Sequence, residues 1–357
     1  MLVSERQSIC IIGTGAQTAV GLSAPASTAA VRAGIAARGN HPFMVDQMGA
    51  PMVVCAVPNL GVDLDAVERF LQLALTPARE ALAPVLQHSK ARLQCSLFVA
   101  LPEQRPGMPE HFENTFAEKF AIVLAKDINI QRLVVNSFGH AGGLYCMEQA
   151  LSLLQSGKSQ FCLIGGVDSY LDPETLEWLD ALEQLHSETT IWGFCPGEGA
   201  GFCLLTSTDR AASLGLPIAM EIISAASAKE ANPIKTQTVC IGQGLSEAFK
   251  KSLAHLPRDN QIDHTICDMN GEPYRGNEYG FAVLRSPGKF ADEADFMTPA
   301  DCWGDVGAAS GPLFAILATS AANKGYAPGP HTFLWASSEG GLRATALLHS
   351  TSAKAQI

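Results

Sequence analysis

The sequence predicts an α/β protein made of two similar halves, residues 1–212 and 213–357, that pack into one body. Short apolar runs typical of buried strands alternate with segments whose apolar residues recur every three or four positions, as in an amphipathic helix. This alternation occurs twice over similar lengths. No linker longer than about ten residues separates the two series, which favours halves of one body over independent domains.

Composition indicates a compact globular protein with a large core. The chain has 357 residues, of which 47% are hydrophobic and 17% are charged. Disordered chains show the opposite balance. A net charge of −11 argues against nucleic acid as a main partner, because phosphates would be repelled. An acidic carrier protein would be repelled as well, since Lys and Arg are scattered and form no basic patch in the sequence.

The ten cysteines lie in apolar strand or helix patterns without C-x-x-C spacing. We therefore expect reduced, buried thiols, no metal site and no cofactor. The turn after the first strand is not a dinucleotide loop, because Thr18 stands where a third glycine is needed. The N-terminal apolar run Ile9–Ile12 is too short for a signal peptide, and no apolar segment reaches the length of a membrane span. The expected location is the cytoplasm.

In the first half, apolar runs predict strands and apolar periodicity predicts helices. The expected strands are Ile9–Ile12, Met52–Val57 and Leu93–Leu101, and the expected helices are Val62–Val85, His111–Ala125 and Asp172–Leu185. We expect the first of these helices to break near Pro77. The second carries Phe112, Phe116 and Phe120 at steps of four, a stripe that predicts core packing and not a ligand site.

The stretch Gln131–Ser169 organises this half as a strand, a sharp turn, a helix and a second strand. The first strand is Leu133–Val135, and the turn is Ser137-Phe138-Gly139. The helix ends at Ser156-Gly157, and its apolar residues are Leu144, Met147, Leu151 and Leu154. The second strand, Phe161–Ile164, leads into Gly165-Gly166. His140 is the residue at the turn. It is expected at the positive end of the helix dipole, where free backbone N–H groups activate a nucleophile and stabilise an oxyanion.

This stretch resembles the nucleophile elbow of β-ketoacyl-acyl carrier protein synthases, members of the thiolase superfamily. In that family a Cys begins the helix, a Ser-Gly pair closes it and a Gly-Gly pair ends the next strand. Counting back from these pairs places His140 on the Cys position without a gap. The glycine-rich segment Gly193–Gly201 is similar to a second family segment. The resemblance implies a thiolase-like fold with five α/β layers, and a homodimer that pairs through Arg132–Asn136.

The second half is predicted to repeat the pattern of strands and helices. The expected strands are Ile218–Ala228, His264–Met269, Thr332–Ser338 and Arg343–His349, and the expected helices are Leu245–Leu256 and Gly307–Ala322.

Active members of the family use two histidines beside the Cys, and the resemblance locates both positions. The first His lies in an H-G-T-x-T-P motif, where this chain has Asn270, with Glu272 at the first threonine. The second lies in G-H-x-x-G-A-A-G, where the similar WGDVGAASG has Asp305, or Gly304 if the register shifts by one. The family's G-F-G-G gate corresponds to Ser338–Gly341. The resemblance thus gives as pocket-lining candidates Phe138, Cys195, Glu272, Glu339 and Gly340.

The resemblance implies a remnant site, formed by His140, Asn270 and Asp305, in which the nucleophile and both histidines are replaced. We expect a catalytically defective ketosynthase-like protein, a pseudoenzyme that acts as a binding, adaptor or assembly partner. Shortened proteins of this kind accompany secreted effectors of bacterial type VI systems. One alternative is a non-catalytic subunit paired with an active synthase.

The other alternative is an acyltransferase or acyl hydrolase with a rebuilt site. His140 would then act as a base, oriented by Asp268, Glu272 or Asp305, and the helix end would keep its imidazole neutral. The competing interpretation is that His140 fills a remnant pocket and is held there by hydrogen bonds. Cys146, six residues into the helix, is expected in the core and not at the site.

Overall fold

The computed structural model describes residues 7–61, 63–87, 92–234, 236 and 238–351. The first half contains β1 (Ile9–Thr18), α1 (Ala24–Arg32), β2 (Gly39–Val45), β3 (Pro51–Val54), α2 (Ala66–Leu86), β4 (Gln94–Ala100), α3 (Phe112–Leu124), β5 (Asn129–Asn136), α4 (Gly142–Gln155), β6 (Cys162–Ser169), α5 (Pro173–Ala181), β7 (Glu198–Ser207) and α6 (Thr208–Ser213). The expected division between residues 212 and 213 falls within α6.

The second half repeats the alternation of strands and helices. It contains β8 (Met220–Lys229), α7 (Gln243–Leu253), β9 (His264–Cys267), α8 (Pro273–Leu284), β10 (Phe296–Met297), α9 (Ala300–Trp303), α10 (Ser310–Asn323), β11 (His331–Ser337) and β12 (Leu342–Ser350). Among the described helices, none combines the length and the apolar character that crossing a bilayer requires.

Ten of the described strands form one mixed sheet in the order β10-β9-β11-β12-β8-β1-β7-β6-β4-β5. The two halves of the sheet join at β1 and β8, which pair only from Ile9 to Ile11. Beyond this join β1 pairs with β7 as far as Thr18. The five α/β layers expected from the resemblance are present. The two sheet layers are also joined to each other along this short contact between β1 and β8.

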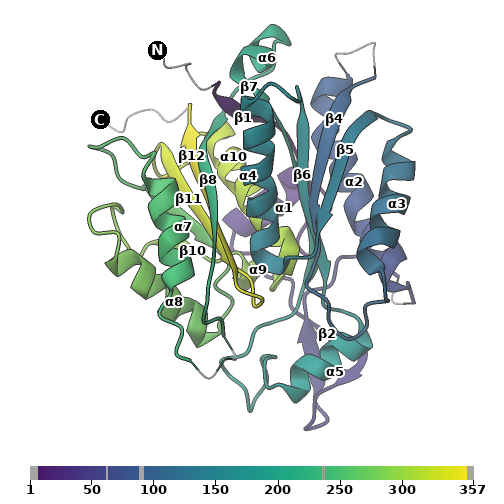
Figure 1. The fold of residues 1–357 in the computed structure, drawn as a ribbon. Coiled ribbons are helices and arrows are strands. Elements are labelled where there is room, and N and C mark those ends of the chain that lie inside the picture. The colour runs from purple at the N-terminus through teal and green to yellow at the C-terminus, as the bar shows by residue number, and fades with distance from the viewer. Residues whose placement is uncertain (1–6, 62, 88–91, 235, 237, 352–357) are drawn as a thin grey trace.

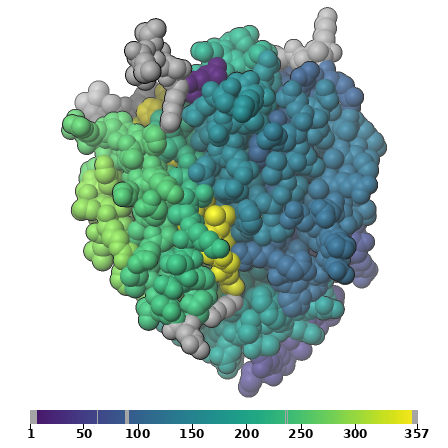
Figure 2. All heavy atoms as spheres, viewed as in Figure 1, coloured from purple at the N-terminus to yellow at the C-terminus, as the bar shows by residue number. Residues whose placement is uncertain are grey.

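The helices form three layers around the two groups of strands, as Figure 1 shows. α2 and α3 cover the outer face of the first group. α4 and α10 lie between the two groups, where their apolar side chains pack against strands of both halves. α7 and α8 cover the outer face of the second group. α10 is buried along most of its length, which explains why it is apolar around most of its circumference. α4, in contrast, lies at the front of the view shared by Figures 1 and 2 and exposes Ser152 to solvent.

The glycines of β1 permit a close approach of α2. A Cβ atom on Gly13 would lie 2.0 Å from the carbonyl oxygen of Ala81, and one on Gly15 would lie 2.0 Å from that of Pro77. Both distances are well inside van der Waals contact, so these positions require glycine. The glycine-containing turn expected after Ile12 is in fact part of β1, and its role is helix–strand packing.

Several predicted boundaries are wrong for physical reasons. α2 runs through Pro77 without a break, because its burial against β1 outweighs the loss of one backbone hydrogen bond. Val62, where this helix was predicted to begin, lies outside the described residues. The helix predicted at Asp172–Leu185 ends at Ala181, and the one at Gly307–Ala322 begins with a 3₁₀ turn. α8 was not predicted, since glycines interrupt its apolar pattern.

Candidate functional site

The site lies where two helix starts meet at the centre of the molecule. β5 ends at Asn136, and a 3₁₀ turn, Gly139–Ala141, leads into α4. A second 3₁₀ turn, Gly307–Ala309, leads into α10. Both turns begin with a glycine of positive φ, +64° at Gly139 and +46° at Gly307, a conformation that other residues adopt only at a cost. A Cβ atom on Gly143 would lie 2.3 Å from Pro312, so the two helices touch at this point.

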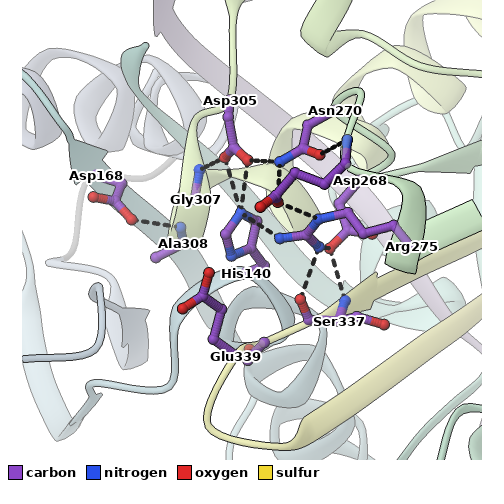
Figure 3. A network of polar contacts seen from close by, with 12 residues as sticks. His140, Asp168, Asp268, Asn270, Arg275, Asp305, Gly307, Ala308, Ser337 and Glu339 are labelled. Atoms are coloured by element: carbon purple, nitrogen blue, oxygen red, sulfur yellow. Dashed lines mark hydrogen bonds and ion pairs between the residues drawn. The ribbon is translucent and has the colours of Figure 1, made fainter. Parts of the chain in front are cut away.

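His140 faces Asp305 across the meeting point of the two helices. The Nε2 atom of His140 lies 2.9 Å from Oδ1 and 3.0 Å from Oδ2 of Asp305. The two side chains are only 8% and 3% exposed. Figure 3 shows the imidazole pointing at the carboxylate from one half of the chain and the carboxylate pointing back from the other. The predicted residues His140 and Asp305 are therefore partners.

Asn270 and an arginine that was not predicted, Arg275, complete the contact. The Nδ2 group of Asn270 donates to Asp305 at 2.6 Å. The Nη2 atom of Arg275 lies 3.3 Å from Nε2 of His140. Its Nη1 group donates to Asp268 at 2.6 Å and to the carbonyl of Ser337 at 2.9 Å. All three remnant-site residues thus meet in one buried polar network, and a guanidinium holds that network against β11 (Figure 3).

The charge state of the pair follows from these contacts. Burial and the charge of Arg275 both act to lower the pKa of His140, but the charge and hydrogen bond of Asp305 act in the opposite direction and the pKa is raised overall. Burial alone would raise the pKa of Asp305, and the attraction and hydrogen bond of His140 hold it well below its usual range. The helix dipole was expected to keep His140 neutral. The Asp305 carboxylate has the opposite effect on the pKa of His140 and outweighs the helix dipole, because its full charge lies about 3 Å away.

The backbone donors at the two helix starts already have partners within the chain. The N–H groups of Ala141, Gly307 and Ala308 donate to Ser338 Oγ at 2.9 Å, Asp305 Oδ1 at 2.8 Å and Asp168 Oδ2 at 2.9 Å. Such groups would otherwise be free to bind an anion or a developing oxyanion. Three of these donors are therefore used to hold side chains.

A cavity of about 240 Å³ opens beside His140. The lining residues are Pro102, Glu103, Gln104, Arg105, Gly139, His140, Asp168, Tyr170, Trp178, Leu179, Phe194, Glu272, Arg275, Asp305 and Glu339. Most of the charged ones are ordered by contacts, as with Arg105, whose Nη2 donates to Asp168 at 2.5 Å. Figure 3 shows the Glu339 side chain pointing toward the imidazole from the side away from Asp305.

The predicted pocket residues divide into two groups. Glu272 and Glu339 line the cavity. Phe138 is 43% exposed and packs edge-on against Tyr145. Cys195 turns its sulfur toward Cys55 on another loop, and the N–H group of Gly340 donates to Glu103 at 2.9 Å. These three are not among the residues that line the cavity.

Sequence reasoning missed Glu103, Arg105, Asp168 and Arg275. Asp168 had a usable signal, since it is a carboxylate at the end of an otherwise apolar strand. Arg275 lies five residues after Asn270, but no motif marks it, and Glu103 and Arg105 belong to a loop without a pattern. Each is placed by the fold and not by its neighbours in the sequence.

Glu230, Cys240 and Glu278 are the cluster among the described residues that could approach a metal ion, with ligand atoms within 4.8 Å of one another. Their carboxylates are already engaged. Glu278 accepts from Arg343 at 2.5 Å and from Ser337 at 3.0 Å, and Glu230 accepts from the N–H of Gly244 at 2.6 Å. These contacts account for the cluster without a cation.

Comparison with known proteins shows a ketosynthase-like chain. Residues 135–211 match the sequence profile of the β-ketoacyl synthase N-terminal domain. A search of curated protein sequences finds no match. The structure is similar to the ishigamide ketosynthase/chain length factor, with a TM-score of 0.79 at 18% identity over 96% of this chain and 99% of that one.

Two further structures show the same fold. A type II polyketide ketosynthase, bound to a hexaketide and in complex with its acyl carrier protein, gives a TM-score of 0.78 at 15% identity over 97% of this chain and 100% of that one. The ketosynthase from module 6 of the bacillaene synthase from Bacillus subtilis 168 gives 0.77 at 13% identity, over 96% and 72%. The thiolase-like fold predicted from the sequence is confirmed.

The His140–Asp305 pair predicts a pH-dependent stability. Because folding raises the pKa of His140, the contribution is complete below the unfolded-state value of about 6.5 and is lost as pH rises through the folded-state pKa. The unfolding free energy of the wild type minus that of His140→Gln, measured with urea from pH 5.5 to 9, should fall by up to about 1.4 kcal/mol per pH unit between the unfolded-state and the folded-state pKa and level off above the latter. His111→Gln, at a side chain that is 75% exposed, is the matched control. A difference that stays flat for His140→Gln would show that the pair does not titrate.

Proposed function

We propose that this ketosynthase-like chain is a catalytically defective member of its fold that acts as a binding, adaptor or assembly partner of another protein. The observation that carries the proposal is the engagement of His140. This residue lies in the 3₁₀ turn that leads into α4, where the resemblance places the family's nucleophile, and its Nε2 atom is engaged by the Asp305 carboxylate at 2.9 Å. A histidine that is fixed in a buried contact of this kind has a structural role, which is difficult to combine with a role as nucleophile or base.

The charge state of His140 argues against nucleophilic or base catalysis. The raised pKa favours imidazolium, which has no lone pair for attack or for accepting a proton. Asp305 adds a negative charge where a synthase must stabilise an enolate or oxyanion, which is the wrong sign for that chemistry. Three nearby backbone donors, the N–H groups of Ala141, Ala308 and Gly307, are occupied by Ser338, Asp168 and Asp305 itself.

No described cysteine replaces the missing thiol at this position. The nearest in sequence, Cys146, lies within α4 and is fully buried. Burial raises its pKa to about 12, although a hydrogen bond from Asn136 acts in the opposite direction. A thiol in that state does not form thioesters at neutral pH, because the thiolate is the nucleophile.

The cavity beside His140 is small for an acylated pantetheine arm. Its volume of about 240 Å³ is below the range of roughly 300–1,000 Å³ that holds drug-sized ligands. Ionic side chains fill much of its wall, whereas an acyl chain requires an apolar one. These features support a closed remnant site, and they favour a function that lies on the surface of the protein.

The nature of the partner follows from the resemblance and from the similar structures. The resemblance suggests a secreted effector, as for the shortened proteins of type VI systems, or an active synthase. Two of the similar structures are described as a ketosynthase/chain length factor and as a ketosynthase in complex with an acyl carrier protein. Complexes with other proteins therefore occur on this fold, which supports a protein partner for this chain.

A second candidate function is acyl hydrolysis with a rebuilt site. The contact between His140 and Asp305 favours it, because carboxylate-oriented histidines serve as bases in hydrolases. It requires the neutral imidazole and an attacking water, since no serine or cysteine lines the described cavity. The raised pKa of His140 ranks this candidate below the first.

An activity assay separates the two candidates. Incubation with acyl-CoA and p-nitrophenyl esters should give no acyl adduct by intact-mass spectrometry and no hydrolysis above buffer, because the site offers no free nucleophile. Wild type and His140→Ala should behave alike. Hydrolysis by the wild type that disappears in His140→Ala would replace the binding proposal by the hydrolase.

Co-purification from the native cell tests the binding role. The tagged chain should retain one protein in stoichiometric amount, and a secreted effector would define an adaptor whereas an active synthase would define a subunit. The tag expressed alone is the control. Recovery of the chain without a partner, together with measurable ester turnover, would contradict the proposal.

We further propose that the chain forms a homodimer through β5. This strand is the edge of the ten-stranded sheet, and its neighbouring apolar residues Leu133, Val134 and Val135 are all half-buried. An exposed edge with apolar side chains is a site for pairing with another chain. Two-fold pairing of β5 with a second copy would cover both its backbone groups and these side chains.

Val134→Lys tests this interface, because a lysine at the centre of the paired edge would bury an uncompensated charge. We expect light scattering coupled to size exclusion to show the mass of a dimer for the wild type and of a monomer for Val134→Lys. Leu284→Lys, at a side chain that is 78% exposed on α8, should remain dimeric. An unchanged dimer in Val134→Lys would place the interface elsewhere.

A further inference from the structure

Two cysteines from distant parts of the sequence meet beside the site. The Sγ atoms of Cys55 and Cys195 lie 3.6 Å apart. Cys55 follows β3, and Cys195 lies in the glycine-rich segment that precedes β7. Cys55 is fully buried and Cys195 is 8% exposed. No other pair of thiols in the described part of the chain shows such a contact in its side-chain hydrogen bonds.

The backbone holds the two residues side by side. The N–H group of Cys55 donates to the carbonyl of Pro196 at 2.8 Å, and that of Glu198 donates to the carbonyl of Cys55 at 3.3 Å. A disulfide requires a sulfur separation of about 2.05 Å, so the sulfurs must approach by roughly 1.5 Å. The surroundings are small and apolar, with Ala19, Ala37 and Val53 against the pair. No bulky side chain separates the two sulfurs, but Cys55 lies tightly against Gly304, where a Cβ atom would be 3.2 Å from its Sγ, so closing the gap presses on this backbone.

Cys195 is the more reactive of the two. The contact with the Cys55 thiol lowers its pKa, burial acts in the opposite direction, and the charge of Arg38 lowers it further. The pKa of Cys55 is raised, first by the same contact and then by its burial. Exposure also assigns the first reaction with an oxidant to Cys195, because this residue is 8% exposed whereas Cys55 is fully buried.

We propose that Cys55 and Cys195 form an oxidation site that a small hydroperoxide, such as hydrogen peroxide, converts to a disulfide. The Cys195 thiolate attacks the peroxide, the O–O bond breaks, and Cys195 becomes a sulfenic acid while hydroxide leaves. The Cys55 sulfur then attacks the sulfur of Cys195, an S–S bond forms, and water leaves with the thiol proton. In total, two thiols and one hydrogen peroxide give one disulfide and two water molecules.

A cavity that can hold small molecules lies next to the residues that flank the pair. Ala37, which packs against both cysteines, also lines a cavity of about 180 Å³ together with Val54 and Ala56, the residues on either side of Cys55. Hydrogen peroxide is close to water in size, so such a cavity admits it. Cys95 and Cys162 are close enough for their charges to interact, but the Cys95 sulfur contacts the carbonyl of Ser96 and not the other thiol. Burial raises the pKa of Cys95, Cys162 and Cys203.

Oxidation at this site acts on the remnant site through the backbone. The N–H group of Asp305 donates to the carbonyl of Cys195 at 2.8 Å. Gly304 packs so closely that a Cβ atom there would lie 3.0 Å from Cβ of Cys55. Drawing the two sulfurs together therefore moves groups that position Asp305, and with it the contact to His140.

Peptide mapping tests the proposal directly. Reduced protein is treated with hydrogen peroxide, free thiols are blocked with N-ethylmaleimide, and the digest is analysed by mass spectrometry without reductant. We expect a product that joins the peptides of Cys55 and Cys195, at least about tenfold more abundant than any other cysteine pairing. Absence of this product, or its formation no faster than other pairings, would overturn the proposal, and neither result depends on a variant.

Variants define the order of the steps. In Cys55→Ser, dimedone should trap a sulfenic acid on Cys195, because the resolving thiol is gone. In Cys195→Ser, Cys55 should stay unmodified, and the matched control Cys162→Ser should form the disulfide as the wild type does. The ring signals of His140 in histidine-labelled protein should shift on oxidation of the wild type and not of Cys195→Ser. Sulfenic acid on Cys55 in place of Cys195, or an unshifted His140, would contradict the mechanism or the coupling.

Discussion

The buried contact between His140 and Asp305 is the interaction on which the site depends. It joins the first turn before α4 to the strand-like segment before α10, and so connects the two halves of the chain at their centre. Removing one partner of such a pair leaves an uncompensated charge, which costs about 3–5 kcal/mol in other proteins. Asn270 supports the pair because its Nδ2 group donates to Asp305, whereas the positive charge of Arg275 acts against the charged form of His140. The network therefore links the two halves of the chain as one structural unit.

A steric constraint supports this electrostatic one. The starts of α4 and α10 approach so closely that Gly143 meets Pro312 and Gly311 meets Leu144. Two helix N-termini in contact concentrate partial positive charge and unpaired N–H groups in one place. Such a place favours an anion or a developing oxyanion. Here the chain supplies its own anions, Asp305 and Asp168, and a hydroxyl, Ser338, which accept hydrogen bonds from three of these N–H groups.

The alternation of strands and helices was predictable from the sequence, because apolar periodicity reports burial locally. β11 and β12 lie close to their predicted spans, and the stripe of Phe112, Phe116 and Phe120 is buried in the core. Strands and helices with much exposed surface were less predictable. β2 carries mostly exposed residues, and α8 contains glycines on an open face, so neither has the pattern that burial imposes. Pro77 predicted a break in the helix that does not occur, because packing against β1 keeps α2 continuous through this residue.

For the site, the sequence by itself determined which residue types stand at the positions of interest: a histidine at the turn, an asparagine and an aspartate further on, and no cysteine at the start of the helix. Only the tertiary structure decided that His140 and Asp305 are partners, that Arg275 joins them, and that Cys195 faces Cys55 and not the cavity. These partners are up to 165 positions apart in the chain. Local patterns encode which face of an element is buried, whereas the direction of a charge and the identity of its neighbour depend on how distant elements pack, and no periodicity records that.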